Sequence, residues 1–117
     1  MEISRIAAAL RCRPRFAQKL FTAAERAYCL GQCREAAAFA ARFAAKEAVA
    51  KALGQSLRWQ EVEIGRGEAG RPRVQLRGQA KDLAGAGEVL LSLSHSRDYA
   101  VAMAVLLSCD PVPGGKR

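Results

Sequence analysis

The chain has 117 residues, the usual size of one domain, and half of them are hydrophobic, so a globular protein is expected rather than a disordered one. No apolar run reaches the roughly 18 uncharged residues of a membrane span, and the N-terminal charge order is wrong for a secretory signal peptide, so we expect a cytoplasmic protein. The net charge of +8 favours a polyanionic partner: nucleic acid, anionic lipid, an acidic protein or a phosphate-rich small molecule.

The first half of the chain is predicted to be helical. Residues 2–10 form a first helix, Arg13-Pro14-Arg15 breaks it, and 15–20 form a short turn of helix. The stretch TAAE, from Thr22 to Glu25, has the spacing of a capping box and starts a helix over 23–30. After Gly31, a long alanine-rich helix runs to Leu53, where Gly54 supplies a C-terminal stop.

The second half is predicted to form strands. Polar and apolar residues alternate over 58–64 and 73–77, and the turn between them makes a hairpin. Residues 78–87 are a short helix or helical loop. Two apolar strands, 88–94 and 99–107, are joined by His-Ser-Arg-Asp. Helices followed by a mainly antiparallel sheet give an α+β domain over 1–108, and 109–117 is expected to be a flexible tail.

The long helix carries more charge than its apolar character suggests. Between Ala36 and Leu53 the only residues other than Ala, Phe, Val and Leu are Arg42, Lys46, Glu47 and Lys51, and the helical wheel leaves no stripe for solvent. One interpretation is that Glu47 and Lys51 form a surface ion pair, while Arg42 and Lys46 extend their charged ends to solvent. The other is an anion site of three cations around one oxygen ligand, which suits a divalent metal with a diphosphate.

The four cysteines, Cys12, Cys29, Cys33 and Cys109, do not form a metal-ligand pattern, because no histidine lies near the closest pair. We expect free, buried thiols in a reducing compartment.

Several motifs together resemble one family. The block RFAAKEAVAKALG, with FTAAERAYC before it and SLSHSRDYAVA after it, looks like the holo-acyl-carrier-protein synthases, the small 4′-phosphopantetheinyl transferases. Shorter matches, EISRI, EVEI and GRPRVQL, follow in the family's order, so the resemblance covers nearly the whole chain. It implies the 4′-phosphopantetheinyl transferase fold, in which helices including one long buried helix pack on a mainly antiparallel sheet, assembled as a homotrimer with coenzyme A bound between subunits.

The resemblance also implies an activity. Such enzymes transfer 4′-phosphopantetheine from coenzyme A to a serine of apo acyl carrier protein in fatty acid biosynthesis, with Mg²⁺ as cofactor and adenosine 3′,5′-bisphosphate as the other product. Glu47 matches the metal-binding glutamate, and Lys51 matches a lysine that stabilises charge on the phosphate under attack. Arg42 and Lys46 match basic residues that line the coenzyme cleft.

Two further segments match coenzyme-binding positions. Ser94, His95 and Ser96 correspond to the family's Ser-His-Ser/Thr segment, although the only histidine of a chain is often a structural hydrogen-bonding residue. Gly70, Arg71 and Pro72 correspond to a Gly-Lys-Pro loop beside the cleft, although these residues are also an ordinary turn.

The same resemblance implies an acidic partner for the excess of positive charge. Acyl carrier proteins are acidic and dock on the family's first helix, where Arg5 matches a docking arginine; Arg15 and Lys19 match basic positions just after it, and Arg11 and Arg13 add charge nearby. The alternative is a solvated basic face, in which single charges contribute little.

One element of the family pattern is missing. Family members begin with a strand that carries a second metal ligand, an aspartate, and here Met1 falls after that position. Either the true start lies upstream, which we expect, or the chain is truncated with weakened metal binding. The competing functions are therefore an active synthase, an impaired relative that binds coenzyme A or carrier protein, and a basic nucleic-acid-binding module that only net charge supports.

Overall fold

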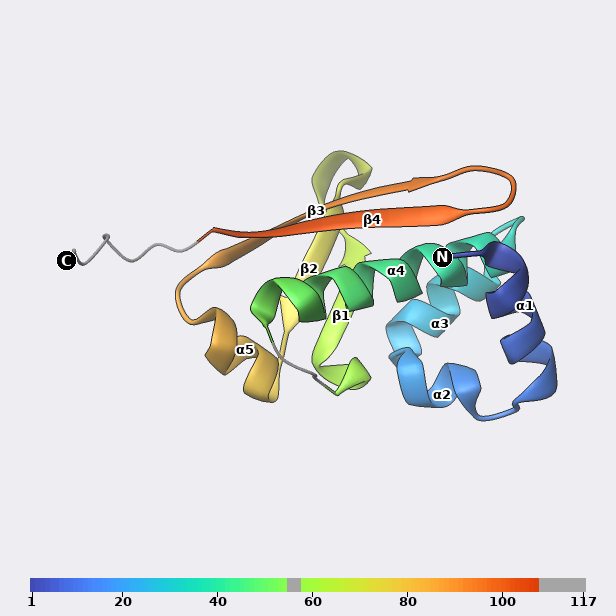
Figure 1. Cartoon of the computed structure of the whole chain (residues 1–117), viewed down its shortest axis with the longest axis horizontal. Coiled ribbons are helices and arrows are strands. Elements are labelled where there is room, and N and C mark those ends of the chain that lie inside the picture. The colour runs from blue at the N-terminus through green and yellow to red at the C-terminus, as the bar shows by residue number, and fades with distance from the viewer. Residues whose placement is uncertain (55–57, 108–117) are drawn as a thin grey trace.

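The computed structural model describes residues 1–54 and 58–107, and within these ranges the chain forms the predicted α+β fold (Figure 1). Helices and strands fall in the order α1 (Ile3–Cys12), α2 (Phe16–Leu20), α3 (Ala23–Leu30), α4 (Glu35–Leu53), β1 (Val62–Arg66), β2 (Pro72–Leu76), α5 (Gly78–Ala84), β3 (Glu88–His95) and β4 (Ala100–Leu107). Short 3₁₀ helices occupy Trp59–Glu61 (η1) and Glu68–Gly70 (η2). The predicted tail 109–117, with Cys109, lies outside the described residues.

The predicted helix ends are confirmed at two places. The Thr22 hydroxyl accepts a hydrogen bond from the Glu25 amide at 3.2 Å, and the Glu25 carboxylate accepts one from the Thr22 amide at 2.8 Å, which completes the capping box. Gly54 ends α4 in the left-handed conformation with φ of 82°, which glycine adopts without steric cost.

The strands form two separate antiparallel hairpins in the described part of the chain, not one sheet as predicted. In one, β1 pairs with β2, with Val62 opposite Leu76; in the other, β3 pairs with β4, with Glu88 opposite Leu107. The strand predicted over 58–64 is wrong in its first half, because η1 turns there and stacks Trp59 on Phe43, ring centroids 5.2 Å apart. Strand β3 extends through His95, one residue beyond its predicted end.

Helix α4 is the centre of the molecule, as its apolar sequence predicted. It lies along the β3–β4 hairpin, with α1, α2 and α3 gathered at one end and the β1–β2 hairpin across its other side (Figure 1). Small alanine side chains such as Ala40 and Ala45 are fully buried and let these elements approach closely. One core cluster joins α4 to the N-terminal helices through Phe21 and Phe39, and another joins it to β1 through Val49 and Ile64.

The chain start runs beside β4. Met1 accepts a hydrogen bond from the Ala100 amide at 2.9 Å, its terminal ammonium donates to the Ala100 carbonyl at 2.8 Å, and Glu2 forms an antiparallel bridge with Tyr99. These contacts place Met1 against the part of β4 that lies over α4.

The β3–β4 hairpin leaves one face uncovered. Along β4, Ala102 and Ala104 pack toward the core, whereas alternate apolar side chains on the other face are exposed: Val101, Met103, Val105 and Leu107, with Leu90 from β3. This alternation is the period-2 pattern of a strand that has only one face against its own core.

No helix in the described ranges has the length and apolar character needed to cross a membrane.

Candidate functional site

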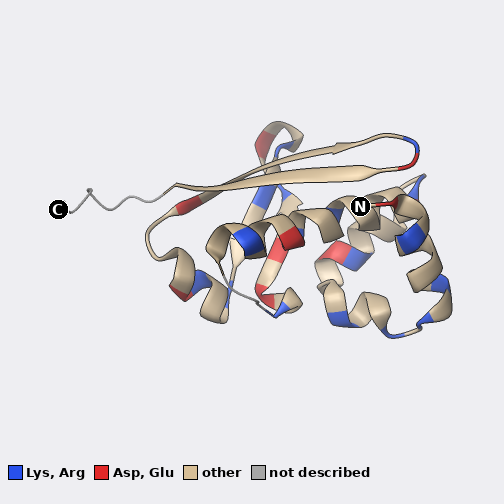
Figure 2. Ribbon diagram, viewed as in Figure 1, with Lys and Arg blue, Asp and Glu red and all other residues tan. Residues whose placement is uncertain are grey.

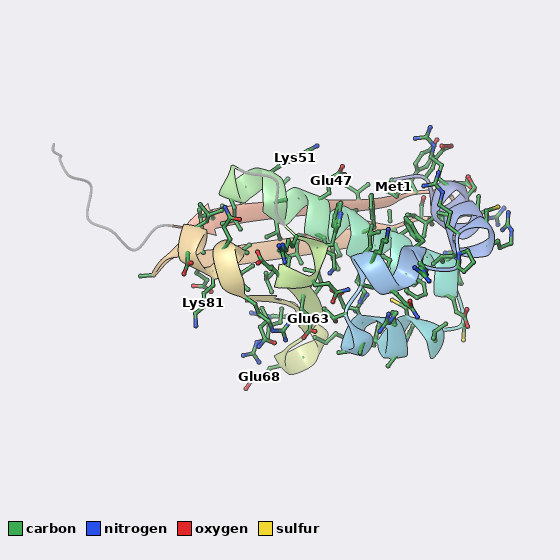
Figure 3. All side chains as sticks on the ribbon, turned by 90° about the horizontal axis from the view of Figure 1, so that it is seen from below. Met1, Glu47, Lys51, Glu63, Glu68 and Lys81 are labelled. Carbon is green, nitrogen blue, oxygen red and sulfur yellow. The ribbon has the colours of Figure 1, made fainter. Side chains whose placement is uncertain are left out.

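Helix α4 directs its charged side chains to two sides. Arg42 and Lys46, one turn apart, are buried, whereas Glu47 and Lys51, also one turn apart, are exposed. The expectation that no stripe of this helix faces solvent is therefore wrong at Glu47 and Lys51. At about 100° per residue the two pairs point roughly 140° apart. In Figure 3, Glu47 and Lys51 lie with Met1 along one edge of the molecule, and Glu63 and Glu68 lie on the opposite side.

On the buried side lies a cavity of about 480 Å³, which we call the Arg42 pocket. Four residues predicted to bind coenzyme A line it: Arg42, Gly70, Pro72 and His95. They come from α4, the turn before β2 and the end of β3, so the fold brings together positions that are far apart in the sequence. Tyr28, Arg34 and Arg66 also line this pocket.

Arg42 is the most buried cation of this pocket. Its guanidinium carbon lies 4.0 Å from the centroid of the Tyr28 ring, and the Arg66 guanidinium lies 5.2 Å from the same ring. Among the described residues, no acceptor bonds the buried Nε of Arg42. A buried donor without a partner is costly, so an anionic ligand oxygen at this position would be favourable. Arg66 was not predicted, since nothing in the sequence distinguishes it from other surface arginines.

His95 occupies the last pair of the β3–β4 ladder, opposite Ala100, and its side chain is exposed at the pocket. The turn that follows is closed by Ser96, whose amide donates to the Tyr99 carbonyl at 2.8 Å and whose hydroxyl accepts from the Tyr99 amide at 3.3 Å. Ser94 and Ser96 are not among the described residues that line the pocket, and the Ser96 hydroxyl serves the turn instead.

Arg71 is separated from Gly70 in the predicted loop, whereas Pro72 borders the depressions of both. Gly70 has φ of 74°, a conformation suited to glycine, and the chain turns there so that Arg71 lines a different depression, between β2, α5 and β3. The predicted grouping of Gly70, Arg71 and Pro72 at one ligand therefore holds within one chain only for the glycine and the proline.

Lys46 also differs from its predicted place at the coenzyme cleft. Its side chain is 1% exposed, and its ammonium lies 2.7 Å from Oε1 of Glu25 and donates to the Trp59 carbonyl at 2.7 Å. Oε2 of Glu25 accepts from the Ile64 amide at 2.6 Å. Burial lowers the pKa of Lys46, and the hydrogen bond with Glu25 opposes that shift. The pair joins α3, α4, η1 and β1, and Lys46 does not line the Arg42 pocket.

On the exposed side, a smaller depression of about 230 Å³ lies between α4 and the start of β4, and we call it the Glu47 groove. Glu47 and Lys51 line it together with Met1 and Ala102. In the described ranges no three His, Cys, Asp or Glu side chains gather to hold a metal. Because Mg²⁺ is commonly held by one or two carboxylates plus water and substrate phosphates, Glu47 fits as a single ligand of such an ion.

The two depressions therefore contain different halves of the predicted site. The expectation that one helix gathers Arg42, Lys46 and Lys51 around Glu47 is not met within one chain, because Arg42 and Glu47 open to different sides. The geometry separates a half that contains the buried Arg42 from a half that contains Glu47 and Lys51.

The predicted docking cations are exposed. Arg5 and Arg11 lie on α1, and Arg15 and Lys19 lie at the start and in the last turn of α2; Figure 2 shows basic positions recurring along these helices. Arg5 lies 3.6 Å from Glu2 in a surface pair. One contact was not predicted: Nε2 of the Gln60 side chain donates to the Gln18 and Phe21 carbonyls, each at 2.8 Å, and so caps the end of α2.

The cysteines agree with the predicted burial at one described position only. Cys29 is fully buried, and burial raises the pKa of its thiol to about 11, with the charge of Arg42 opposing the shift. Cys12 and Cys33 are exposed free thiols, contrary to the expectation that the thiols are buried.

Comparisons with known proteins agree with this architecture. A family model described as the 4′-phosphopantetheinyl transferase superfamily matches residues 1–104. A holo-[acyl-carrier-protein] synthase of Moorella thermoacetica is 50% identical, with 92% of this chain and 89% of that protein covered. The corresponding protein of Chlamydia caviae is 46% identical, with 92% and 91% covered.

Solved structures give the same result. The holo-ACP synthase of Plasmodium yoelii superposes with a TM-score of 0.82 at 29% identity, covering 94% of this chain and 91% of that one. The Bacillus anthracis holo-(acyl-carrier-protein) synthase, solved in complex with CoA (3′,5′-ADP), gives 0.77 at 32% identity, covering 92% and 90%. The chain therefore belongs to the 4′-phosphopantetheinyl transferase superfamily and, within it, to the holo-[acyl-carrier-protein] synthases, as its motifs predicted.

Proposed function

We propose that this chain transfers 4′-phosphopantetheine from coenzyme A to a serine of apo acyl carrier protein and releases adenosine 3′,5′-bisphosphate. The observation that carries the proposal is the Arg42 pocket, where a buried guanidinium whose Nε has no partner among the described residues lies in one cavity with His95 and Arg66. A nucleotide that bears several phosphates supplies the anionic oxygens that this pocket lacks. The names of the relatives, and the CoA (3′,5′-ADP) complex of the Bacillus anthracis protein, support this choice of ligand.

The reaction needs little covalent help from the protein. The serine oxygen attacks the phosphorus on the pantetheine side of the diphosphate, the bond from that phosphorus to the bridging oxygen breaks, and the nucleotide leaves with that oxygen. Positioning and charge neutralisation dominate such steps. In this proposal Lys51 neutralises charge on the diphosphate, and Glu47 receives the serine proton directly or through a water molecule. Mg²⁺, with Glu47 as one ligand, supplies further charge neutralisation when bound.

The proposed enzyme is a homotrimer in which the Arg42 pocket of one subunit faces the Glu47 groove of the next. Two observations support this assembly. The two halves open to different sides of one chain, so a single coenzyme requires two copies to reach both. The outer face of the β3–β4 hairpin exposes Val101, Met103 and Val105, which a neighbouring subunit would cover. Contacts between two different surfaces form a closed ring when the rotation between neighbours divides a full turn evenly, as it does in a trimer.

The carrier protein is proposed to dock on α1 and α2. Exposed Arg5, Arg11, Arg15 and Lys19 present positive charge on one pair of helices, and an acidic partner would be attracted and oriented by it. Phe16 and Leu20 line a depression of about 580 Å³ beside Arg15 and Lys19, which offers apolar contact within the charged rim. The proposed setting is cytoplasmic fatty acid biosynthesis.

A mass measurement tests the activity. The purified chain is incubated with apo acyl carrier protein, coenzyme A and Mg²⁺, and the carrier protein should gain the mass of one phosphopantetheine arm. No gain, with coenzyme A still bound, would instead support a relative that only binds the coenzyme. No gain and no binding would overturn the proposal.

A variant with an added N-terminal segment tests the metal half. The Glu2–Tyr99 bridge sets an antiparallel register in which the position two residues before Met1 falls opposite Ala102, which lines the Glu47 groove. An extension with aspartate at that position should lower the Mg²⁺ concentration needed for activity. The matched extension with asparagine should not, and equal Mg²⁺ requirements of the two would contradict the assignment of Glu47 to a metal.

Mixing two inactive variants tests the shared site. Arg42→Ala disables only the pocket and Glu47→Gln only the groove, so unfolding and refolding the two together should restore activity. Random assembly puts both intact halves at about a quarter of the contacts, so about a quarter of the parent activity is expected. Activity no higher than that of either variant alone would contradict a site built from two subunits.

A further inference from the structure

A single arginine connects the start of α4 to the turn after His95. Arg34 is the N-cap residue of α4, and its guanidinium donates from Nη2 to the Arg97 carbonyl at 2.7 Å and from Nη1 to the Ser96 carbonyl at 3.3 Å. The donor and its acceptors are 62 and 63 residues apart in the sequence. The planar guanidinium bonds two neighbouring carbonyls at once, which one lysine ammonium does less well.

Two other sets of contacts hold the turn. One lies within it, and the other joins its far side to the start of the chain, where the Ile3 amide donates to the Asp98 carbonyl at 2.8 Å and Glu2 bridges to Tyr99. Ser96 and Tyr99 close it through the hydrogen bonds described above, but those bonds lie inside the turn and do not fix its place relative to α4. His95, Ser96, Arg97 and Tyr99 are all exposed, so no burial of their side chains holds the end of the hairpin. Figure 1 shows this closed end of the β3–β4 hairpin beyond the first turns of α4.

The chain start holds the Asp98–Tyr99 side of the turn, and Arg34 joins the Ser96–Arg97 side, which directly follows His95, to α4. His95 directly precedes the two acceptor carbonyls, Arg42 is two helical turns after Arg34 on α4, and all three side chains line the Arg42 pocket. Without the Arg34 bonds, the Ser96–Arg97 side of the turn would be released and would carry His95 away from the pocket, while Arg42, buried against Tyr28, stayed in place.

We propose that Arg34 is a positioning residue that holds His95 at the Arg42 pocket and so raises the affinity for the phosphates of coenzyme A. This inference rests on the proposed function. Both of its Nη atoms donate to backbone carbonyls, so Arg34 acts on the ligand through the turn. Because this action concerns binding of the nucleotide rather than the reacting diphosphate, it should change KM for coenzyme A more than kcat.

The test compares two exposed arginines of the same region. Arg34→Ala should raise KM for coenzyme A about tenfold and leave kcat within about twofold. Arg97→Ala is the matched control, since it removes the same charge but keeps the carbonyl that Arg34 bonds, and KM should stay within about twofold of the parent. Arg34→Lys should recover only part of the affinity. An equal rise in KM for Arg34→Ala and Arg97→Ala would reduce the effect to net charge and overturn the proposal.

A double-mutant cycle separates positioning from direct contact. If Arg34 acts through His95, Arg34→Ala should add little to the KM of a His95→Ala protein. The same tenfold rise in both backgrounds would show that Arg34 contacts the nucleotide itself, and the positioning role would be wrong.

Amide hydrogen exchange gives a readout that does not need activity. In the free protein, the Ser96 amide, which donates to Tyr99, should exchange faster in Arg34→Ala and at the parent rate in Arg97→Ala. If the Ser96 amide exchanged at the parent rate in Arg34→Ala, the proposal that Arg34 holds the turn would be wrong. If the parent neither binds coenzyme A nor transfers the arm, the proposed function fails, and with it the role in coenzyme binding, whereas the exchange result still decides whether Arg34 holds the turn.

Discussion

On one side of α4, Lys46 is buried and bonded to Glu25 and to the Trp59 carbonyl, and Arg42 is packed on Tyr28. On the other side, Glu47 and Lys51 are exposed along an open groove. Lys46 and Glu47 are consecutive residues, yet one contributes to the fold and the other is free to meet a ligand. The difference arises from about 100° of helix rotation per residue, so a charged motif on one helix does not by itself define one site.

The contrast between the two sides predicts which property each glutamate controls. Glu25→Gln removes the only carboxylate partner that the structure shows for the buried Lys46 ammonium, and the free energy of unfolding should fall by about 3–5 kcal/mol. Urea denaturation measures this. Glu47→Gln makes the same chemical change on the exposed side and should stay within about 0.5 kcal/mol of the parent.

A double variant tests whether the loss of stability comes from the unpaired charge of Lys46. Adding Lys46→Met to Glu25→Gln removes both charges of the pair, and part of the lost stability should return, since the cost comes from an unpaired buried charge rather than from the missing pair. Equal losses for Glu25→Gln and Glu47→Gln would contradict the assignment of separate roles to the two sides of α4.

Activity should show the opposite order. Glu47→Gln should lower kcat for transfer by about 100-fold or more, because it removes the carboxylate that we propose to accept the serine proton and to hold Mg²⁺. Glu88→Gln, an exposed glutamate at the start of β3, is the matched control and should keep the parent rate. Full activity in Glu47→Gln would remove this residue from the reaction.

The smallest effect is expected at Cys29, which lies on the buried side and whose pKa is raised to about 11 by burial. The unfolded chain loses this proton at lower pH than the folded one, so the folded state binds more protons and stability should fall as pH rises from 9 toward 11. The loss should be about 2 kcal/mol. Cys29→Ala should lack this part of the pH dependence; identical curves for parent and variant would contradict the raised pKa.

The sequence predicted the parts of the molecule that follow from local rules. The capping box at Thr22 and the stop at Gly54 depend on a few neighbouring residues, and both are confirmed. The resemblance implied nine coenzyme-binding residues, of which four, Arg42, Gly70, Pro72 and His95, line one pocket. The other five, Lys46, Lys51, Arg71, Ser94 and Ser96, do not line it.

The remaining features depend on contacts that no local pattern encodes. Lys46 finds Glu25 because α3 packs on α4, and the capping box already explained that glutamate without a second role. Arg34 bonds backbone carbonyls, which every residue type provides, so its partners leave no signature in the sequence. The split of the sheet into two hairpins likewise follows from how β2 and β3 diverge in space.

The exposed face of the β3–β4 hairpin has a consequence for how such a protein behaves on dilution. If Met103 and its apolar neighbours are covered only by another copy, subunits separate by mass action as the concentration falls. Each separated subunit would keep its helices, its own pocket and its own groove. It would lose the groove of the neighbouring subunit, which completes the site at its pocket. Specific activity would then rise with protein concentration, and the amount of enzyme in a cell would itself act as a switch.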